Sequence, residues 1–344
     1  MARRDIVVIG GSAGGIEALS GLASRLPADF GGSVFIVIHV PQGATSVLPR
    51  IISRRGKLPA KHPRNGERIE KGQLYIAPPN FHLVLDRKKI HLVRGPREHG
   101  VRPAVDPLFR SAALSFGDRV VGVVLSGNLD DGTAGLEAIK TNGGATMVQH
   151  PGEAQYPGMI ESAIASGFAD AILPVGEIAG RLSEMIGEPE EEEGAMAVQG
   201  NGDKKEEEEK ELAIDELDLS QLQGDDQPGV VSGFTCPECN GALWELTASD
   251  TLRFRCRVGH AYAVDSLLVR QQDAIENAFW VALRALEERA ALMRRLVRRA
   301  EKSGHRVGIA RYNEEAKTVA ERAKTLRDII LSGVLTDVAE PSAT

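Results

Sequence analysis

The sequence is poor in cysteine, in aromatic residues and in long apolar runs, and these shortages exclude several classes of protein. The chain of 344 residues has three cysteines, all between Cys236 and Cys256, which are too few and too clustered for a disulfide framework. No apolar run approaches the ~20 residues that cross a bilayer, and no secretory signal pattern opens the chain. Aromatic residues make up 4% of the chain and do not interleave with basic ones as on nucleic-acid-binding surfaces. We therefore expect a cytoplasmic protein with no direct membrane insertion and no nucleic-acid partner.

Charge is concentrated in one segment of the chain. Residues 188–229 carry 16 acidic and three basic side chains and no aromatic residue. Self-repulsion and the lack of apolar residues predict a disordered acidic linker, more simply an inert tether than a functional element. This linker separates residues 1–187 from a compact segment, 230–264, and from a helical segment, 265–335.

Residues 1–187 alternate apolar strand-like runs with helical patterns. This alternation predicts an α/β domain with a mainly parallel, doubly wound sheet and helices on both faces. Strands are predicted at 6–10, 34–39, 74–78, 120–126, 145–149 and 171–175, and a β-hairpin is predicted to turn near Asp86–Lys88. Helices are predicted at about 15–25, 45–54, 106–116, 132–142, 158–166 and 176–186.

The first predicted strand runs into a glycine-rich turn, "DIVVIGGSAGG". Serine replaces the middle glycine of a dinucleotide fingerprint, and no Gly-Lys-Ser/Thr follows as in a phosphate-binding loop. The turn instead matches Gly-x-Ser-x-Gly, with Gly10, Ser12 and Gly14, a motif that can expose a nucleophile where a strand meets a helix. The backbone N–H groups that begin at Ala13 would then face an oxyanion beside Ser12. Glycines here could also serve only helix–sheet packing.

Two further predicted strands end in residues that could complete a catalytic triad. His39 ends the second strand, and Asp130 and Asp131 follow the strand at 120–126. Because parallel strands place their carboxyl ends on one edge of a sheet, these side chains and Ser12 should share that edge. A base that takes the serine proton and a carboxylate that orients the base need this layout. A histidine that ends a strand can equally be structural.

Six blocks of the first 185 residues resemble the catalytic domain of the chemotaxis protein-glutamate methylesterase family, CheB. They are "IGGSAGG", "IHVPQG", "NGERIEKGQLYIAPPNFH", "RPAVDPLFRSAA", "VVLSGNLDDGTAG" and "QYPGMIESAI". The resemblance implies a serine hydrolase with Ser12 as nucleophile, His39 as base and Asp131 as orienting carboxylate. It implies methanol release from methylated glutamates of chemoreceptors or similar signalling proteins, with possible deamidation of glutamine, and no cofactor for catalysis.

Two departures from the family pattern limit what the resemblance implies. The chain opens at the catalytic strand, so we expect a stand-alone form without the family's receiver domain, whose regulatory place the C-terminal segments would take. "GNLDDG" replaces the commoner Gly-Met-Gly-x-Asp-Gly, so Leu129 and Asp130 put the substrate preference in doubt. The alternatives are a signalling scaffold that binds a methylated or glutamate-rich partner without turnover, and an esterase for another substrate.

Other polar residues of the first domain give weaker predictions. Arg102 could contact a substrate carboxylate, or form a surface ion pair. His82 and His99 lie in predicted loops and are interpreted as solvated. Eight basic residues between Arg50 and Lys71 would attract acidic receptor helices, although an ordinary solvated surface explains them as well.

All three cysteines fall in the compact segment together with a histidine. Cys236 and Cys239 form a Cys-x-x-Cys pair, and Cys256 and His260 follow after a predicted hairpin. Three thiolates and one imidazole complete a tetrahedral zinc shell with no open position, so we predict a structural zinc ribbon. A segment of about thirty residues also needs such a ligand to be stable. A redox pair or free thiols are the alternatives.

The helical segment has one apolar seam. The seam residues are Leu268, Ile275, Phe279, Ala282, Leu286, Met293 and Leu296, continued by Ala316, Val319, Ala320, Ala323, Leu326 and Ile330. This pattern predicts either a helical hairpin closed on itself or a helix for dimerisation or partner binding.

Overall fold

The computed structural model describes residues 4–40, 46–186, 211, 229–247, 250–302 and 308–332. They belong to two compact units, Met1–Leu267 and Leu268–Thr344. The predicted acidic linker lies outside the described residues, apart from Glu211 and Gly229. No described helix is both long and apolar enough to cross a membrane.

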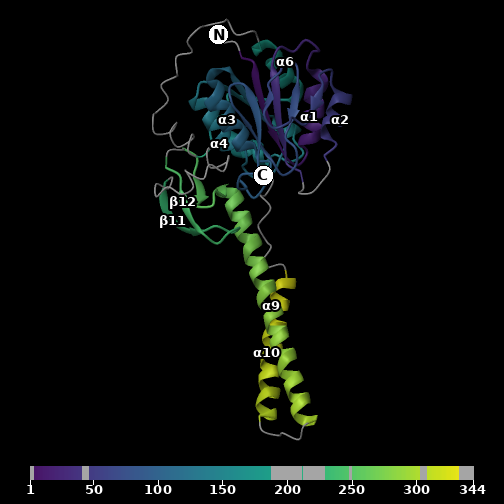
Figure 1. Ribbon diagram of the computed structural model, residues 1–344, viewed down its shortest axis with the longest axis vertical. Helices are drawn as coiled ribbons and strands as arrows, with labels where there is room; N and C mark the ends of the chain where they lie inside the picture. The colour runs from purple at the N-terminus through teal and green to yellow at the C-terminus, as the bar shows by residue number, and fades with distance from the viewer. Residues whose placement is uncertain are drawn as a thin grey trace. The chain divides into compact units, whose positions relative to one another are not determined.

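The first unit is built on a seven-stranded sheet whose paired strands all run parallel (Figure 1). The strand order is β10-β9-β8-β1-β2-β5-β3. The strands are β1 (Ile6–Gly11), β2 (Ser33–Ile38), β3 (Ala60–Lys61), β5 (Leu74–Ile76), β8 (Val120–Val124), β9 (Ala145–Gln149) and β10 (Ala171–Leu173). The predicted fold class of this region is therefore confirmed.

Helices cover both faces of this sheet, as Figure 1 shows. The helices on one face are α1 (Gly15–Arg25), α2 (Leu48–Arg55) and α6 (Val175–Met185). Those on the other are α3 (Val105–Phe116), α4 (Thr133–Thr141) and α5 (Gly158–Ala165). Along β1, Val7 and Ile9 pack into the first layer while Ile6 and Val8 pack into the second. Alternate side chains point to opposite faces, so a sheet covered on both sides needs the unbroken apolar runs that the sequence has.

Two smaller antiparallel sheets complete the unit. One contains β4 (Glu67–Arg68), β7 (Lys89–Val93) and β6 (His82–Leu85), of which β6 and β7 are the predicted hairpin. The other contains β11 (Val230–Thr235), β12 (Ala242–Glu245), β13 (Arg253–Cys256) and β14 (Ala261–Ala263). Short 3₁₀ turns at Gly117–Arg119 and Pro151–Glu153 precede β8 and α5.

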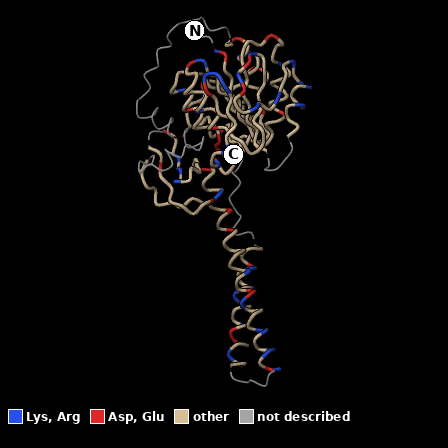
Figure 2. Tube along the Cα trace, viewed as in Figure 1, with Lys and Arg blue, Asp and Glu red and all other residues tan. Residues whose placement is uncertain are grey.

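Helix α9 (Val264–Lys302) begins in the first unit and continues in the second, where α10 (Ile309–Leu331) packs against it. The predicted seam is partly wrong. Met293 is buried, but Leu268, Ile275 and Leu296 are exposed, and the buried positions of α9 also include Leu283, Ala290 and Val297. On α10 the buried positions Ala316, Val319 and Ala323 agree with the prediction. Charged residues occur along both helices (Figure 2).

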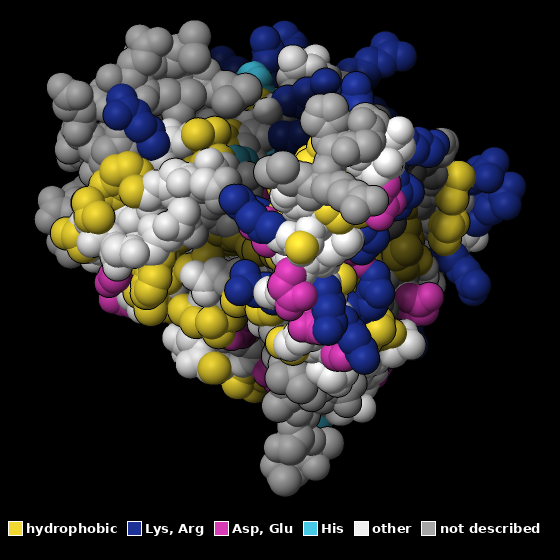
Figure 3. Space-filling model, turned by 90° about the horizontal axis from the view of Figure 1, so that it is seen from below, with side chains coloured by type: hydrophobic (Ala, Val, Ile, Leu, Met, Phe, Trp, Pro, Cys, Tyr) yellow, Lys and Arg dark blue, Asp and Glu magenta, His cyan; other side chains and the backbone are white. Residues whose placement is uncertain are grey.

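The surface of the molecule is mixed in character. The face seen in Figure 3 has hydrophobic, basic and acidic side chains next to one another.

Candidate active site

Three adjacent strands bring the predicted triad to one edge of the sheet. Strand β1 lies between β2 and β8. Ser12 directly follows β1, His39 directly follows β2, and Asp131 lies in the loop between β8 and α4. The His39 N–H donates to Gly11 O at 3.1 Å and so ties two of these strand ends together. This is the strand-end position at which sites form in open parallel sheets.

The predicted base and its carboxylate are hydrogen-bonded. His39 Nε2 lies 2.7 Å from Asp131 Oδ2. The same carboxylate accepts the backbone N–H of Val105 at 2.7 Å and that of Asp106 at 3.0 Å. These donors, at the start of α3, fix the orientation of Asp131, which is 2% exposed. This bond leaves the Nδ1 atom of His39 available for a second contact.

The charge of Asp131 is stabilised despite its burial. Burial by itself would raise the pKa of this carboxyl. The positive charge of His99, together with the hydrogen bonds from His39 and Val105, brings the pKa below its ordinary value. Asp131 is therefore ionised at neutral pH and can stabilise a positively charged His39.

The Ser12 turn has the geometry of a nucleophile turn. Ser12 N–H donates to Ser126 O at 2.9 Å, and Gly15 N–H closes the turn on Ser12 O at 2.9 Å. Gly14 has φ +71°, and a Cβ there would lie 2.6 Å from Ser126 Oγ, so this position needs glycine. Among the described residues, no acceptor binds the N–H groups of Ala13 and Gly14. Two such free amides beside a serine hydroxyl are what an oxyanion requires.

A second glycine lets the neighbouring loop approach Ser12. A Cβ on Gly127 would lie 2.9 Å from Ser12 Cβ and 2.1 Å from the sulfur of buried Met159. Gly127 N–H also donates to Tyr156 O at 2.8 Å. The loop after β8 therefore packs directly against the nucleophile turn.

Leu129 and Asp130, which put the substrate preference in doubt, precede Asp131 in the loop after β8. Asp130 is 3% exposed, and its Oδ2 accepts the N–H of Asp265 at 2.8 Å and that of Ser266 at 3.3 Å. Leu129 stands where the family pattern has glycine and has φ +66°, a conformation that glycine adopts without strain. Asp130 thus binds another part of the chain, and the doubt about the substrate preference stays open.

The interpretation of His82 and His99 as solvated is wrong. His82 is fully buried; its Nε2 binds Pro96 O at 2.8 Å, and burial lowers its pKa to about 4. His99 is 4% exposed and lies among three carboxylates, one of which is Asp131. The apolar context of β6 could have indicated burial of His82. No local pattern marks His99, because its partners come from distant segments.

Arg102 is fixed to its own loop. Its guanidinium donates to the carbonyl oxygens of Arg94 and Gly95, and burial lowers its pKa. A contact with substrate stays a prediction for this residue.

The three cysteines and His260 come together in the β11–β14 sheet. Cys236 Sγ and Cys256 Sγ lie 3.7 and 3.5 Å from His260 Nδ1, and Cys239 Sγ lies 3.6 Å from Cys256 Sγ. All four candidate ligand atoms lie within 4.8 Å of one another. Glu98, His99 and Asp106 form a second group with this spacing. There Glu98 is bound by two arginines and His99 by Asp106, so this group is a network of ion pairs.

The first unit has an α/β fold with the predicted triad residues at one sheet edge, and comparison with known proteins gives its family. The family model for the CheB methylesterase matches residues 7–182, half of the chain, and the chain belongs to this family. The crystal structure of the Thermotoga maritima CheB methylesterase catalytic domain is similar, with a TM-score of 0.52 and 33% identity. The match covers 53% of this chain and 99% of that one.

Named relatives match about half of the chain. The protein-glutamate methylesterase/protein-glutamine glutaminase 2 of Methanosarcina acetivorans is 37% identical over 194 residues, and the match covers 54% of each chain. The protein of the same name from Anaeromyxobacter dehalogenans is 38% identical over 184 residues, again with 54% of each chain covered. The chain thus spans about half the length of these relatives.

Proposed function

We propose that this chain is a protein-glutamate methylesterase that uses Ser12 as nucleophile, His39 as base and Asp131 as orienting carboxylate. The observation that carries the proposal is the 2.7 Å bond between His39 and Asp131, beside a serine turn with two free amides. Membership of the CheB methylesterase family supports the same reaction.

The geometry suggests how the reaction would proceed. Nε2–H of His39 donates to Asp131, so Nδ1 is the basic atom that takes the Ser12 proton. Ser12 Oγ then attacks the ester carbonyl, and the N–H groups of Ala13 and Gly14 bind the oxyanion. Protonated His39 gives its proton to the leaving methoxide, which departs as methanol. Water activated by His39 then hydrolyses the acyl-enzyme and restores Ser12.

The substrate follows from the relatives' names and from this chemistry. We propose methylated glutamates of chemoreceptors or similar signalling proteins as substrates. Ammonia can leave in place of methanol, so glutamine deamidation is a second reaction of the same site. A cytoplasmic location, as expected from the sequence, stays a prediction.

Methanol release tests this function. Intact protein is mixed with chemoreceptor membranes methylated with a radioactive methyl group, and volatile methanol is measured for wild type, Ser12→Ala and Ser24→Ala. Ser24 is exposed on α1 and bonds only within its own helix, to Gly21 O, so Ser24→Ala serves as the control. We expect release from wild type and Ser24→Ala and a loss of at least ~10³-fold in Ser12→Ala. Equal release from wild type and Ser12→Ala would disprove the role of Ser12.

We also propose that Cys236, Cys239, Cys256 and His260 hold a structural zinc ion. Zn–S and Zn–N bonds of about 2.3 and 2.0–2.1 Å in a tetrahedron place two sulfurs ~3.8 Å apart and a sulfur and a nitrogen ~3.6 Å apart. The distances of 3.5–3.7 Å found here fit that shell. His260 Nε2 lies 3.4 Å from a Glu238 carboxylate oxygen, the outer partner that a zinc-bound imidazole usually has.

Metal analysis tests the zinc site. We expect one zinc per purified chain by mass spectrometry, and loss of that zinc in Cys239→Ser. A chain that holds no zinc after refolding with the metal would refute the proposal.

The segments that follow the α/β domain have proposed roles outside the catalytic reaction. We infer that residues 188–229 act as a tether, and that the β11–β14 ribbon and the α9–α10 helices serve regulation, partner binding or self-association. Removal of residues 188–344 should then change the methanol release rate or the binding of receptor. A truncated protein with unchanged behaviour in both assays would contradict this.

A further inference from the structure

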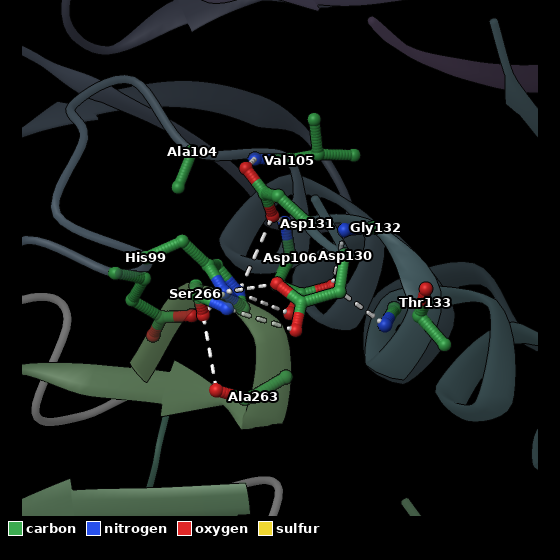
Figure 4. Close-up of polar contacts among 12 residues, drawn as sticks. His99, Ala104, Val105, Asp106, Asp130, Asp131, Gly132, Thr133, Ala263 and Ser266 are labelled. Atoms are coloured by element: carbon green, nitrogen blue, oxygen red, sulfur yellow. Dashed lines mark hydrogen bonds and ion pairs between the residues drawn. The ribbon is translucent and has the colours of Figure 1, made fainter. Parts of the chain in front are cut away.

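A second histidine lies behind the catalytic carboxylate. His99 belongs to the loop that precedes α3, and its ring is almost fully buried. Figure 4 shows the ring between Asp106, Asp130, Asp131 and Ser266. His99 Nε2 lies 2.9 Å from Asp106 Oδ2 and 3.5 Å from Asp131 Oδ1. His99 Nδ1 lies 2.9 Å from Ser266 Oγ and 3.4 Å from Asp130 Oδ1.

The hydrogen-bond partners of His99 determine its protons. His99 Nδ1 lies 3.4 Å from Asp130 Oδ1, a carboxylate oxygen that can only accept a hydrogen bond. The Ser266 hydroxyl can also accept from Nδ1–H while it donates its own proton to Ala263 O at 3.1 Å. Both neighbours thus favour a proton on Nδ1. On the other side of the ring, the Asp106 carboxylate can only accept, so Nε2 is also a donor. A ring with both nitrogens donating is an imidazolium.

The charges around the ring agree with this state. Asp106, Asp130 and Asp131 are all almost fully buried. Burial would lower the pKa of His99, but the charge of Asp131 and the bonds from Asp106 and Asp130 raise it well above its ordinary value. Without a cation, three carboxylates in such a small buried volume would repel one another. The imidazolium holds the loop that carries Asp130 and Asp131.

The ring is itself held by the far end of the first unit. Ser266 lies in the first turn of α9, directly after the ribbon. The N–H groups of Asp265 and Ser266 donate to Asp130, and the His99 N–H donates to Ala261 O in β14 at 2.7 Å. A residue more than 130 positions after Asp131 thus completes the polar shell behind it.

We propose that the His99 imidazolium is a positioning residue for Asp131 and that Ser266 holds this imidazolium in place. The segment that joins the ribbon to α9 is then part of the active site, and its detachment lowers activity. This inference rests on the proposed roles of Ser12, His39 and Asp131.

Two variants of nearly equal volume at one position test it. Ser266→Thr keeps the hydroxyl, whereas Ser266→Val replaces it with a methyl group. The full chain with zinc is used, and equal melting temperatures for the two variants establish equal folding. The rate at which a fluorophosphonate labels Ser12 is measured from pH 5 to 9, together with kcat and KM for methanol release.

We expect Ser266→Val to label Ser12 roughly tenfold more slowly than Ser266→Thr, through kcat and not KM. Loss of a positive charge beside Asp131 also changes the electrostatic environment of the triad, so the pH profile of labelling should differ between the two variants. A structural role alone would lower the rate at every pH without changing the profile. Identical profiles for the two variants would refute the proposal.

Nitrogen NMR keeps this test independent of the substrate. In protein with ¹⁵N-labelled histidine, the signal that disappears in His99→Gln belongs to His99, and we expect both ring nitrogens to carry protons at pH 7.5. A neutral ring would overturn the proposal. Failure to release methanol with an unchanged His99 signal and normal labelling of Ser12 would reject only the proposed substrate.

Discussion

A buried glutamate offers a quantitative test of how the first unit holds together. Glu98 is fully buried, and its Oε1 accepts from Arg110 Nη2 at 2.5 Å and from Arg255 Nη2 at 2.6 Å. Arg110 belongs to α3 and Arg255 to β13, so one carboxylate joins the catalytic fold to the ribbon. Both arginine side chains are 1% exposed. The perturbation is Glu98→Gln, which keeps the shape and removes the charge.

The size of the effect follows from burial. Removing one partner of a buried ion pair costs about 3–5 kcal/mol, because it leaves an uncompensated charge in the interior. Here two guanidinium groups lose their shared partner, although Glu211 Oε2 lies 3.1 Å from Arg110 Nε and retains part of the compensation. We therefore expect the free energy of unfolding to fall by about 3–5 kcal/mol. At about 2–4 °C per kcal/mol for a unit of this size, the melting temperature should fall by about 6–20 °C.

The loss of stability in Glu98→Gln should also depend on pH. Burial would raise the pKa of Glu98, but Arg110 and Arg255 hold it well below its ordinary value. A carboxyl with a lowered folded-state pKa stabilises fully above its unfolded pKa and loses this effect as pH falls to the folded value. The difference between wild type and Glu98→Gln should therefore be constant from pH 8 down to about pH 5 and shrink in stronger acid.

Thermal unfolding followed by circular dichroism measures this effect, with Glu184→Gln as control. Glu184 pairs with Arg181 on the exposed surface of α6, where such pairs contribute about 0–1 kcal/mol. A change in melting temperature for Glu98→Gln no larger than that of the control would refute the assigned role of the buried cluster.

Two glycine-related predictions concern the catalytic loop. Leu129→Gly should relieve the strain of φ +66° and stabilise the protein by about 0.5–1 kcal/mol. The melting temperature should therefore rise slightly. A lower melting temperature would show that the packing of Leu129 stabilises the protein more than its backbone strain destabilises it. Gly127→Ala should push a methyl group against Ser12 and Met159, destabilise by about 1–3 kcal/mol and slow phosphonate labelling of Ser12; normal labelling would mean that the loop can move away without affecting the site.

The main sheet could be predicted because local sequence patterns mark its strands and the helices beside it. Each long strand of this sheet is an apolar run, and each helix shows the periodic spacing of apolar residues that is typical of helices. The observed ends of β9 and α1 therefore agree with the predicted ones. Strands β3 and β4 were not predicted. Each has two residues, and pairing with β5 or β7 defines them, whereas their own sequences are polar and short.

The helical tail shows where periodicity alone is insufficient. Residues at spacings of three, four and seven can be chosen along more than one line of a 39-residue helix. The cluster that α9 forms with α10 contains Leu286 and Met293 of the predicted seam and adds Ala290. Leu268, Ile275 and Leu296, also predicted for the seam, are exposed. The position of α10, and not the pattern in α9, decides which line is buried.

Some residues of the candidate site could likewise be predicted from the sequence, and others could not. Ser12, His39 and Asp131 could be placed together because each follows a strand and parallel strands end at one edge. His99 and Asp130 could not, because their partner Ser266 lies beyond the segment 188–229 and nothing in the local sequence marks it. Asp130, beside the proposed catalytic Asp131, put the substrate preference in doubt, yet its carboxylate binds the start of α9. The contacts of Asp130 are therefore explained by a segment of this chain outside the matched residues 7–182. The role of such a residue can be judged only together with the segment that contacts it.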